Sequence, residues 1–183
     1  MGAQTFDPWF MTDEDRNLAY EYLGDWLLKP DVVLAPDGEP YLYRWHIIYD
    51  NQRGNEFFHI QVKSDPERPF HDHPWPNASK IIAGGYDELY YEAPELVTWR
   101  YEGHELLKTP SPAIRQLRKG DKVERAATTA HRLILPSDIP YTMTRFSTGP
   151  KTREWGFWYP DGWHHNKRHV DDRPTGISYG KHE

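Results

Sequence analysis

A succession of short segments with alternating apolar and polar residues restricts what this chain can fold into more than any other feature. Alternation with a period of two predicts β-strands, because successive side chains of a strand point to opposite faces. Turn-forming sequences, such as Pro-Asp-Gly at 36–38 and Lys-Gly-Asp at 119–121, separate the segments. Many short strands without helices between them indicate an all-β fold, a sandwich or barrel of the jelly-roll type. The expected strands are 41–49, 56–62, 80–84, 87–92, 96–101, 114–117, 131–135, 141–146 and 155–159.

One α-helix is expected ahead of the strands, over residues 12–28. Thr12 can cap it, acidic residues occupy its first turn, and Pro30 ends it. Apolar residues at three- and four-residue spacing are expected to form its buried face, namely Leu18, Ala19, Tyr22, Leu23, Trp26 and Leu27.

The length of 183 residues suits one domain with a sizeable core. We therefore predict a single domain over 1–183, with the helix at 12–28, a β-barrel at 40–160 and a C-terminal tail at 161–183. The 8 tryptophans and 12 tyrosines supply flat rings that can fill this core or line a ligand cavity, and the core is the default interpretation.

Composition narrows the possible partners. A formal net charge of −6 leaves no overall basic field for nucleic acid, although Arg115, Arg118 and Lys119 form a local basic cluster. The first residues lack the pattern of a secretory leader, and no run approaches about 20 apolar residues, so no membrane partner is expected and a cytoplasmic location is predicted. The chain has no cysteine, so any metal must be held by nitrogen and oxygen ligands.

The stretch His71-Asp72-His73-Pro74 carries the clearest sign of a site. In an extended strand, the two imidazoles point to one face and can chelate one ion, while Asp72 points away. Pro74 has no amide hydrogen and suits a strand end, where a metal stays open to solvent and substrate.

The spacing around these histidines resembles the two sequence motifs of the cupin superfamily. Counting from His71 and His73 places Asn77 where the first motif has glutamate and Gly84 at its closing glycine. In the second motif, Gly120 and His131 keep their eleven-residue interval, while its proline, second glycine and asparagine are replaced by Ala126, Thr128 and Leu135.

A closer resemblance is to a bacterial and phage cupin family with HDHPW and TGP...WGF motifs. It rests on five strings of this sequence: YRWHII from Tyr43, SDPERPFHDHPW from Ser64, GGYDE from Gly84, ERAATTAHRL from Glu124 and TGPKTREWGFWYPDGW from Thr148. The resemblance implies a cupin jelly-roll barrel, or double-stranded β-helix, and a three-histidine metal site at His71, His73 and His131. It does not specify a reaction.

A site of three neutral imidazoles suits a divalent first-row metal, and a facial set of ligands leaves coordination positions free. Fe(II) is favoured because a three-histidine site without glutamate is similar to that of the thiol dioxygenases; Zn, Ni or Mn would also suit the ligands. Asn77 or a backbone carbonyl is expected to support the ligands from behind by hydrogen bonding and so to set their tautomers. Glu88 and Asp72 are the carboxylates that could join the site instead.

Substrate recognition is expected from Arg44, Arg125 and Tyr86. An arginine fork can hold a carboxylate or phosphate bidentately, and the competing interpretation of each arginine is a salt bridge with one of the 28 acidic residues. Tyr86 can donate a hydrogen bond near the metal or pack under the turn.

The other histidines are interpreted more plainly. His46 and His59 either line a polar lumen or are inward histidines with satisfied hydrogen bonds, and the second interpretation is favoured. The group His164, His165 and His169 is interpreted as a solvated terminal segment.

These observations favour a metal-dependent dioxygenase that acts on a small anionic molecule. Two alternatives stay open: a non-redox isomerase, epimerase or lyase, with His46, His59, Tyr86 or Glu88 as its base, and a ligand-binding cupin without catalysis. A homodimer is also possible.

Overall fold

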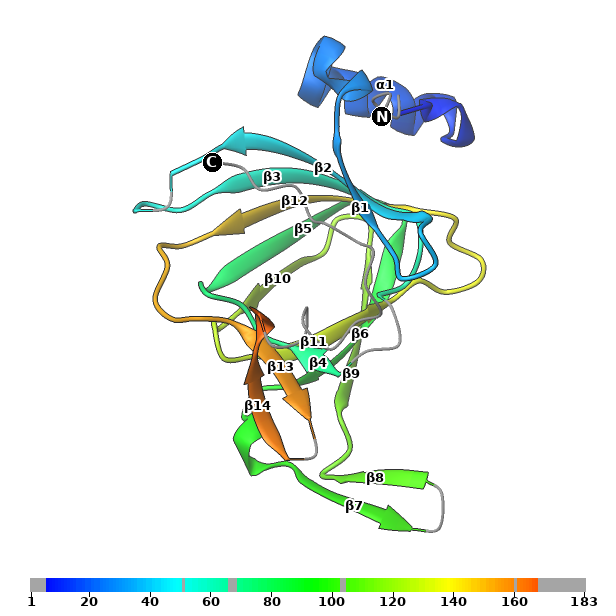
Figure 1. Ribbon diagram of the computed structural model, residues 1–183. Coiled ribbons are helices and arrows are strands. Elements are labelled where there is room, and N and C mark those ends of the chain that lie inside the picture. The colour runs from blue at the N-terminus through cyan, green and yellow to red at the C-terminus, as the bar shows by residue number, and fades with distance from the viewer. Residues whose placement is uncertain (1–5, 51, 66–68, 103–104, 160, 168–183) are drawn as a thin grey trace.

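The chain folds into a jelly-roll barrel built from two six-stranded sheets that face each other (Figure 1). The computed structural model describes residues 6–50, 52–65, 69–102, 105–159 and 161–167. The first sheet has the strand order β1-β2-β3-β12-β5-β10 and the second has the order β14-β13-β4-β11-β6-β9. Strands distant in sequence are neighbours in both sheets, as in a jelly roll, so the all-β expectation is confirmed.

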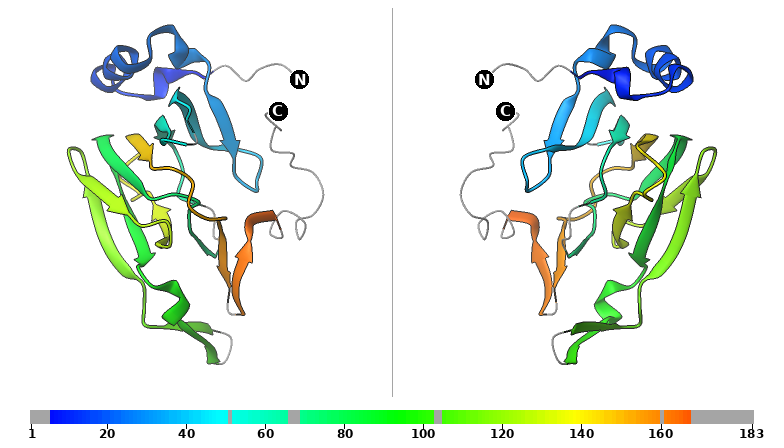
Figure 2. Two further views of the ribbon diagram at one scale, coloured as in Figure 1. Left: turned by 90° about the vertical axis from the view of Figure 1, so that its left-hand side faces the viewer. Right: turned by 90° about the vertical axis from the view of Figure 1, so that its right-hand side faces the viewer.

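The strands of the first sheet are β1 (Asp31–Leu34), β2 (Pro40–Ile48), β3 (Glu56–Gln61), β5 (Asn77–Ala83), β10 (Lys122–Arg125) and β12 (Thr142–Thr148). Those of the second are β4 (Phe70–His71), β6 (Gly85–Tyr91), β9 (Ala113–Arg118), β11 (Ala130–Ile134), β13 (Gly156–Tyr159) and β14 (Gly162–His165). The hairpin of β7 (Thr98–Glu102) and β8 (Glu105–Thr109) projects from one end of the barrel (Figure 2).

The expected helix is real but shorter than the range 12–28. Helix α1 spans Asp13–Leu23, and Thr12 caps it by accepting a hydrogen bond from the Asp15 amide at 3.2 Å. A 3-10 helix follows over Gly24–Leu28. Its three residues per turn change the direction of later side chains, so Trp26, expected on the buried face, is 60% exposed. Tyr22 is also exposed, at 41%. No helix in the described ranges is long and apolar enough to cross a membrane.

This helical segment packs on the outer face of the first sheet (Figures 1 and 2). Its buried side chains meet alternate residues of three strands in one apolar cluster, which includes Ala19, Leu23, Leu27, Trp45, Phe58, Ile60 and Met143. Trp45 also donates its indole hydrogen to the carbonyl of Trp26 at 2.8 Å. Because strand side chains alternate, the residues between these apolar ones face the inside of the barrel.

The barrel extends beyond the predicted range of 40–160 at both ends. Strand β1 precedes that range, and β14 lies within the segment predicted as a tail. His164 and His165 are therefore half-buried strand residues beside Asp161 and Glu154, not part of a solvated segment. His169 lies outside the described residues. Strands as short as β1, β4, β10 and β14 contain too few alternations for sequence periodicity to reveal them.

Gly84 joins β5 to β6 and accounts for the glycine spacing of the first motif. Its φ of 65° lies in the left-handed region, and a Cβ atom there would stand 2.1 Å from the Tyr141 carbonyl oxygen. Only glycine fits this close approach between the two backbones.

Candidate metal centre

Two neighbouring strands of the second sheet bring three histidines together inside the barrel. His71 ends β4 and lies opposite His131 of β11 in the strand register, while His73 follows two residues after His71. The ring centroids are 4.7 Å apart for His71 and His131, 5.1 Å for His71 and His73, and 5.0 Å for His73 and His131. One ring nitrogen of each residue lies within 4.8 Å of the others. The three residues predicted as ligands therefore form one group that could hold an ion.

Burial keeps these imidazoles uncharged near neutral pH. Desolvation lowers the pKa of His71, and it lowers that of His73 further, with help from the neighbouring rings. It lowers the pKa of His131 to about 3, although Glu88 acts in the opposite direction. Neutral imidazoles offer the lone pairs that metal binding requires.

Glu88 of β6 sets the orientation of His131. One of its carboxylate oxygens lies 2.6 Å from Nδ1 of His131. Burial raises the pKa of Glu88, but hydrogen bonds from His131 and Arg125 outweigh this and hold it well below its usual range. An ionised carboxylate only accepts, so Nδ1 carries the hydrogen and Nε2 keeps its lone pair. That Nε2 lies 2.8 Å from Nε2 of His73.

The residue behind the His131 ring is thus Glu88 of β6, not Asn77 of β5, which the spacing of the first cupin motif had suggested. Asn77 was expected behind the ligands, but its Oδ1 accepts a hydrogen bond from Arg125 at 3.2 Å and connects to His131 through Arg125 and Glu88. Glu88 occupies its place because β6 pairs directly with β11, with Leu133 opposite Glu88. Sequence spacing from the His-x-His motif cannot show a neighbour that belongs to another strand.

Asp72 points away from the two flanking histidines, as strand alternation predicts. Its fully buried carboxylate accepts hydrogen bonds from Arg153 at 2.7 Å, the Gly156 amide at 2.8 Å, Trp158 at 3.2 Å and Trp163 at 2.9 Å. It therefore anchors β13 and β14 to the strand end that carries the histidines.

The donor set fits a first-row metal ion. Two imidazole nitrogens that each lie about 2.0–2.1 Å from one ion, at a right angle, are about 3 Å apart. The 2.8 Å separation of Nε2 in His73 and His131 is close to this value. A carboxylate behind a histidine ligand is also a recurrent feature of metal sites, because it fixes the ring and its tautomer.

The histidines open into a cavity of about 390 Å³ between the two sheets. Its wall includes the three candidate recognition residues Arg44, Tyr86 and Arg125. The buried Arg125 already donates to Glu88 at 2.6 and 2.9 Å, to Asn77 and Ser79 through Nη1, and to Tyr86 through Nη2. The salt-bridge interpretation therefore describes Arg125. Arg44 has no ion pair with any carboxylate of the described ranges.

His46 and His59 have different surroundings in the structure. His46 forms an ion pair with Asp31 at 2.9 Å, whereas His59 lines the cavity with a buried Nε2 that has no hydrogen-bond partner among the described residues. The expectation that His59 is a satisfied inward histidine is wrong.

Asp65, which the sequence analysis did not single out, also lines the cavity. Its burial raises its pKa. The sequence signal was weak, because Asp65 precedes the motif in a loop.

The two-sheet jelly roll and its inward three-histidine cluster define a cupin-type barrel with a candidate metal site. No protein-family model matches the chain, and no curated protein matches it.

Among solved structures, the chain is similar to the following three at low identity. The DMSP lyase DddQ from Ruegeria pomeroyi DSS-3 is 20% identical, with 83% of this chain and 72% of that chain covered and a TM-score of 0.48. A cupin 2 conserved barrel domain protein from Rhodopseudomonas palustris is 14% identical, with 66% and 69% covered and a TM-score of 0.46. Fe(II)-HppE with an alternative substrate is 7% identical, at a TM-score of 0.46; 66% of this chain is aligned to it and spans 56% of its length. The chain's own strand order and histidine cluster define it as a cupin-type barrel.

Proposed function

We propose that this protein is a metal-dependent cupin enzyme of the Fe-type oxygenase class that acts on a small anionic molecule. In this proposal His71, His73 and His131 hold a divalent first-row ion, with Fe(II) favoured. The grouping of three neutral imidazoles, one buried and two partly buried, at the wall of a cavity is the observation that carries it. A bound ferrous ion would supply redox chemistry toward dioxygen, which no side chain of this chain can supply.

The chain's own residues would prepare the site in three ways. Glu88 fixes the tautomer of His131, so that Nε2 faces the other ligands. Aromatic side chains of the cavity wall, including Trp75 and Trp155, exclude water from the reacting molecule. Arg44 supplies a positive charge for an anionic substrate, while Tyr86 offers a hydroxyl group beside Arg125.

The cavity carboxylate of Asp65 favours one second candidate, a non-redox isomerase, epimerase or lyase. Such an enzyme needs a base beside the substrate. Asp65 lines the cavity, and its oxygens are held by the Leu133 amide at 2.8 Å and by Gln61 at 3.5 Å. Of the bases first considered, Glu88 is occupied by its arginines and His46 pairs with Asp31.

Metal binding is tested first, on protein made without a histidine tag. We expect close to one divalent ion per chain by elemental analysis, and loss of that ion in the double variant His71→Ala/His73→Ala. The far-UV circular dichroism of this variant should match the parent, because the helix-packed core lies on the other face of the barrel. Retention of the ion by the folded variant would refute the ligand assignment.

The reaction class is tested by anaerobic reconstitution with Fe(II) or with Zn(II), followed by a screen of small carboxylates and thiols. Oxygen consumption with iron alone would support an oxygenase. Turnover that is equally fast with zinc and indifferent to oxygen would replace it with the isomerase or lyase candidate, and Asp65→Asn should then abolish that turnover while the bound metal remains.

A further inference from the structure

We propose that the cavity binds a small organic monocarboxylate whose carboxylate group lies on Arg44 and His59 and whose flat apolar body lies toward the histidine cluster. This inference deepens the proposed function by naming its substrate class, and it rests on that function for the role of the cavity. The anion subsite itself is built from residues other than the candidate metal ligands.

Strand register places Arg44 and His59 side by side. Arg44 of β2 is the direct partner of His59 on β3, and His59 is in turn the partner of Thr144 on β12. All three line the cavity. Directly opposed residues on neighbouring antiparallel strands have Cβ atoms about 5 Å apart, so two such side chains can hold one small group between them.

Both residues have a buried nitrogen without a hydrogen-bond partner in the described part of the chain. These atoms are Nε of Arg44 and Nε2 of His59. Nε of Arg44 is a donor, and Nε2 of a neutral imidazole donates in one of its two tautomers. A buried polar atom without a partner costs stability, and native proteins avoid it unless a ligand or water satisfies the group. Two such atoms on adjacent residues of one cavity wall therefore indicate a missing ligand with acceptor atoms.

Arg44 is an arginine of the cavity wall without a carboxylate partner among the described residues, so an anionic ligand is favoured. Arg125 is compensated by the carboxylate of Glu88, with which it makes two hydrogen bonds. Asp65 directs its oxygens to Leu133 and Gln61. Burial and the nearby cations lower the pKa of His59 to about 3, so it can donate an N–H but adds no charge. The planar guanidinium of Arg44 therefore remains available for a ligand, and a carboxylate matches it in both shape and charge.

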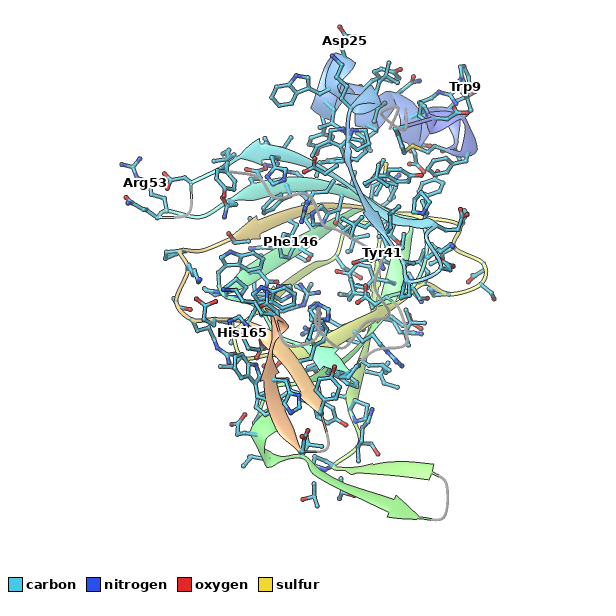
Figure 3. The ribbon with its side chains drawn as sticks, in the orientation of Figure 1. Trp9, Asp25, Tyr41, Arg53, Phe146 and His165 are labelled. Carbon is cyan, nitrogen blue, oxygen red and sulfur yellow. The ribbon has the colours of Figure 1, made fainter. Side chains whose placement is uncertain are left out.

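An aromatic ring connects this subsite with the histidine cluster. Phe146 stacks on His59, with ring centroids 5.3 Å apart and an interplanar angle of 21°, and its centroid lies 6.1 Å from that of His73. Trp75 stacks on His73 at 5.0 Å and meets Phe146 edge to face at 5.8 Å. Figure 3 shows Phe146 at the barrel interior. A flat apolar body would bind along these rings, and the volume of about 390 Å³ restricts it to a small molecule.

The test is a calorimetric titration of metal-free full-length protein with benzoate and with benzamide, which has nearly the same shape without the charge. We expect saturable benzoate binding and at least about 10-fold weaker benzamide binding, as for the loss of a charge-assisted hydrogen bond. Arg44→Gln should weaken benzoate binding about 10-fold or more, with a smaller loss for His59→Phe. Arg44→Lys keeps the charge but loses the planar fork, so it should bind with intermediate affinity.

Arg53→Gln is the matched control. This arginine lies at the tip of the turn between β2 and β3, points away from the barrel (Figure 3), and its side chain is 90% exposed. It makes the same change in net charge and should leave benzoate binding unchanged. Folding of every variant is checked by its thermal unfolding.

Three results would overturn the inference. The first is the absence of saturable benzoate binding up to about 10 mM, a concentration that corresponds to a binding free energy of roughly 3 kcal/mol. The second is equal affinity for benzoate and benzamide. The third is an equal loss of benzoate affinity in Arg44→Gln and Arg53→Gln. Tighter binding of phenyl phosphate than of benzoate would replace the carboxylate with a phosphate ester. Failure of the metal proposal is distinguishable, because benzoate should still bind to metal-free His71→Ala/His73→Ala.

Discussion

Replacing Glu88 with glutamine removes the negative charge that a histidine and two arginines share inside the barrel. The Glu88 side chain is fully buried, and its oxygens lie 2.6 Å from Nδ1 of His131, 2.6 and 2.9 Å from Arg125, and 2.7 Å from Nε of Arg115. The neutral amide keeps nearly the same shape. However, it leaves the guanidinium of Arg125, whose side chain is 1% exposed, without an anion.

Removal of one partner of a buried ion pair costs about 3–5 kcal/mol, because the remaining charge stays desolvated. For a chain of this size each 1 kcal/mol shifts the unfolding midpoint by about 2–4 °C, so a decrease of about 6–20 °C is expected. The assay is thermal unfolding of metal-free protein, followed by urea unfolding for the free energy. Under the proposed function, loss of the support behind His131 should also weaken metal binding about 10–100-fold.

Two comparisons show whether the buried charge is the cause. Glu124→Gln removes the same charge from an exposed pair with Lys122 and should change stability little. Glu88→Gln/Arg125→Met removes both charges, so its loss should be about 1–3 kcal/mol smaller than the sum of the single losses. A midpoint for Glu88→Gln that equals that of Glu124→Gln would refute the reasoning.

Three further predictions concern stability. His59 has a pKa of about 3 in the folded protein and about 6.5 in the unfolded chain, which therefore takes up a proton first as the pH falls. The free energy of unfolding should decrease below pH 6.5 and down to pH 3, by at most about 1.4 kcal/mol per pH unit from this residue. His59→Asn should reduce this slope in urea unfolding between pH 6.5 and 4.5, and an unchanged slope would contradict the prediction. Asp72→Asn leaves Arg153 without its anion and should lower the free energy of unfolding by about 3 kcal/mol. It should also alter the near-UV circular dichroism of Trp158 and Trp163, which donate hydrogen bonds to Asp72. An unchanged spectrum would argue against the anchoring role of Asp72. Gly84→Ala should destabilise by more than about 1–2 kcal/mol, and by more than Gly38→Ala. Both glycines have a positive φ, but the new Cβ at Gly84 lies 2.1 Å from a backbone oxygen, whereas the one at Gly38 has no atom within 4 Å. Equal losses would show that the contact is relieved at no cost.

The sequence was most informative where the evidence is local. Alternation along strands predicted the all-β fold, and the same rule placed His71 and His73 on one face with Asp72 on the other. The cap at Thr12 was also readable, because a cap and its amide partner are three residues apart. Each inference depends on backbone geometry within a few residues, which the local sequence sets largely by itself.

Contacts between distant strands were the part that the sequence could not show. The first cupin motif suggested Asn77 behind the ligands, but the carboxylate there is Glu88, which lies 43 residues before His131. Arg125 and Arg44 looked equivalent as anion-binding residues. One is compensated inside a buried network, while the other faces the cavity without a carboxylate partner among the described residues.

The sequence by itself therefore determined the strand-rich fold, the N-terminal helix cap and the pair of histidines that share a face. Tertiary structure alone decided that β6 lies beside β11, that Asp65 enters the cavity wall, and that β14 pairs with β13. The physical reason is that the direction of a side chain is set by its own strand, whereas its partners depend on strand order and register. Both arise from the packing of the helix and the two sheets around the whole core, to which residues far apart in sequence contribute together.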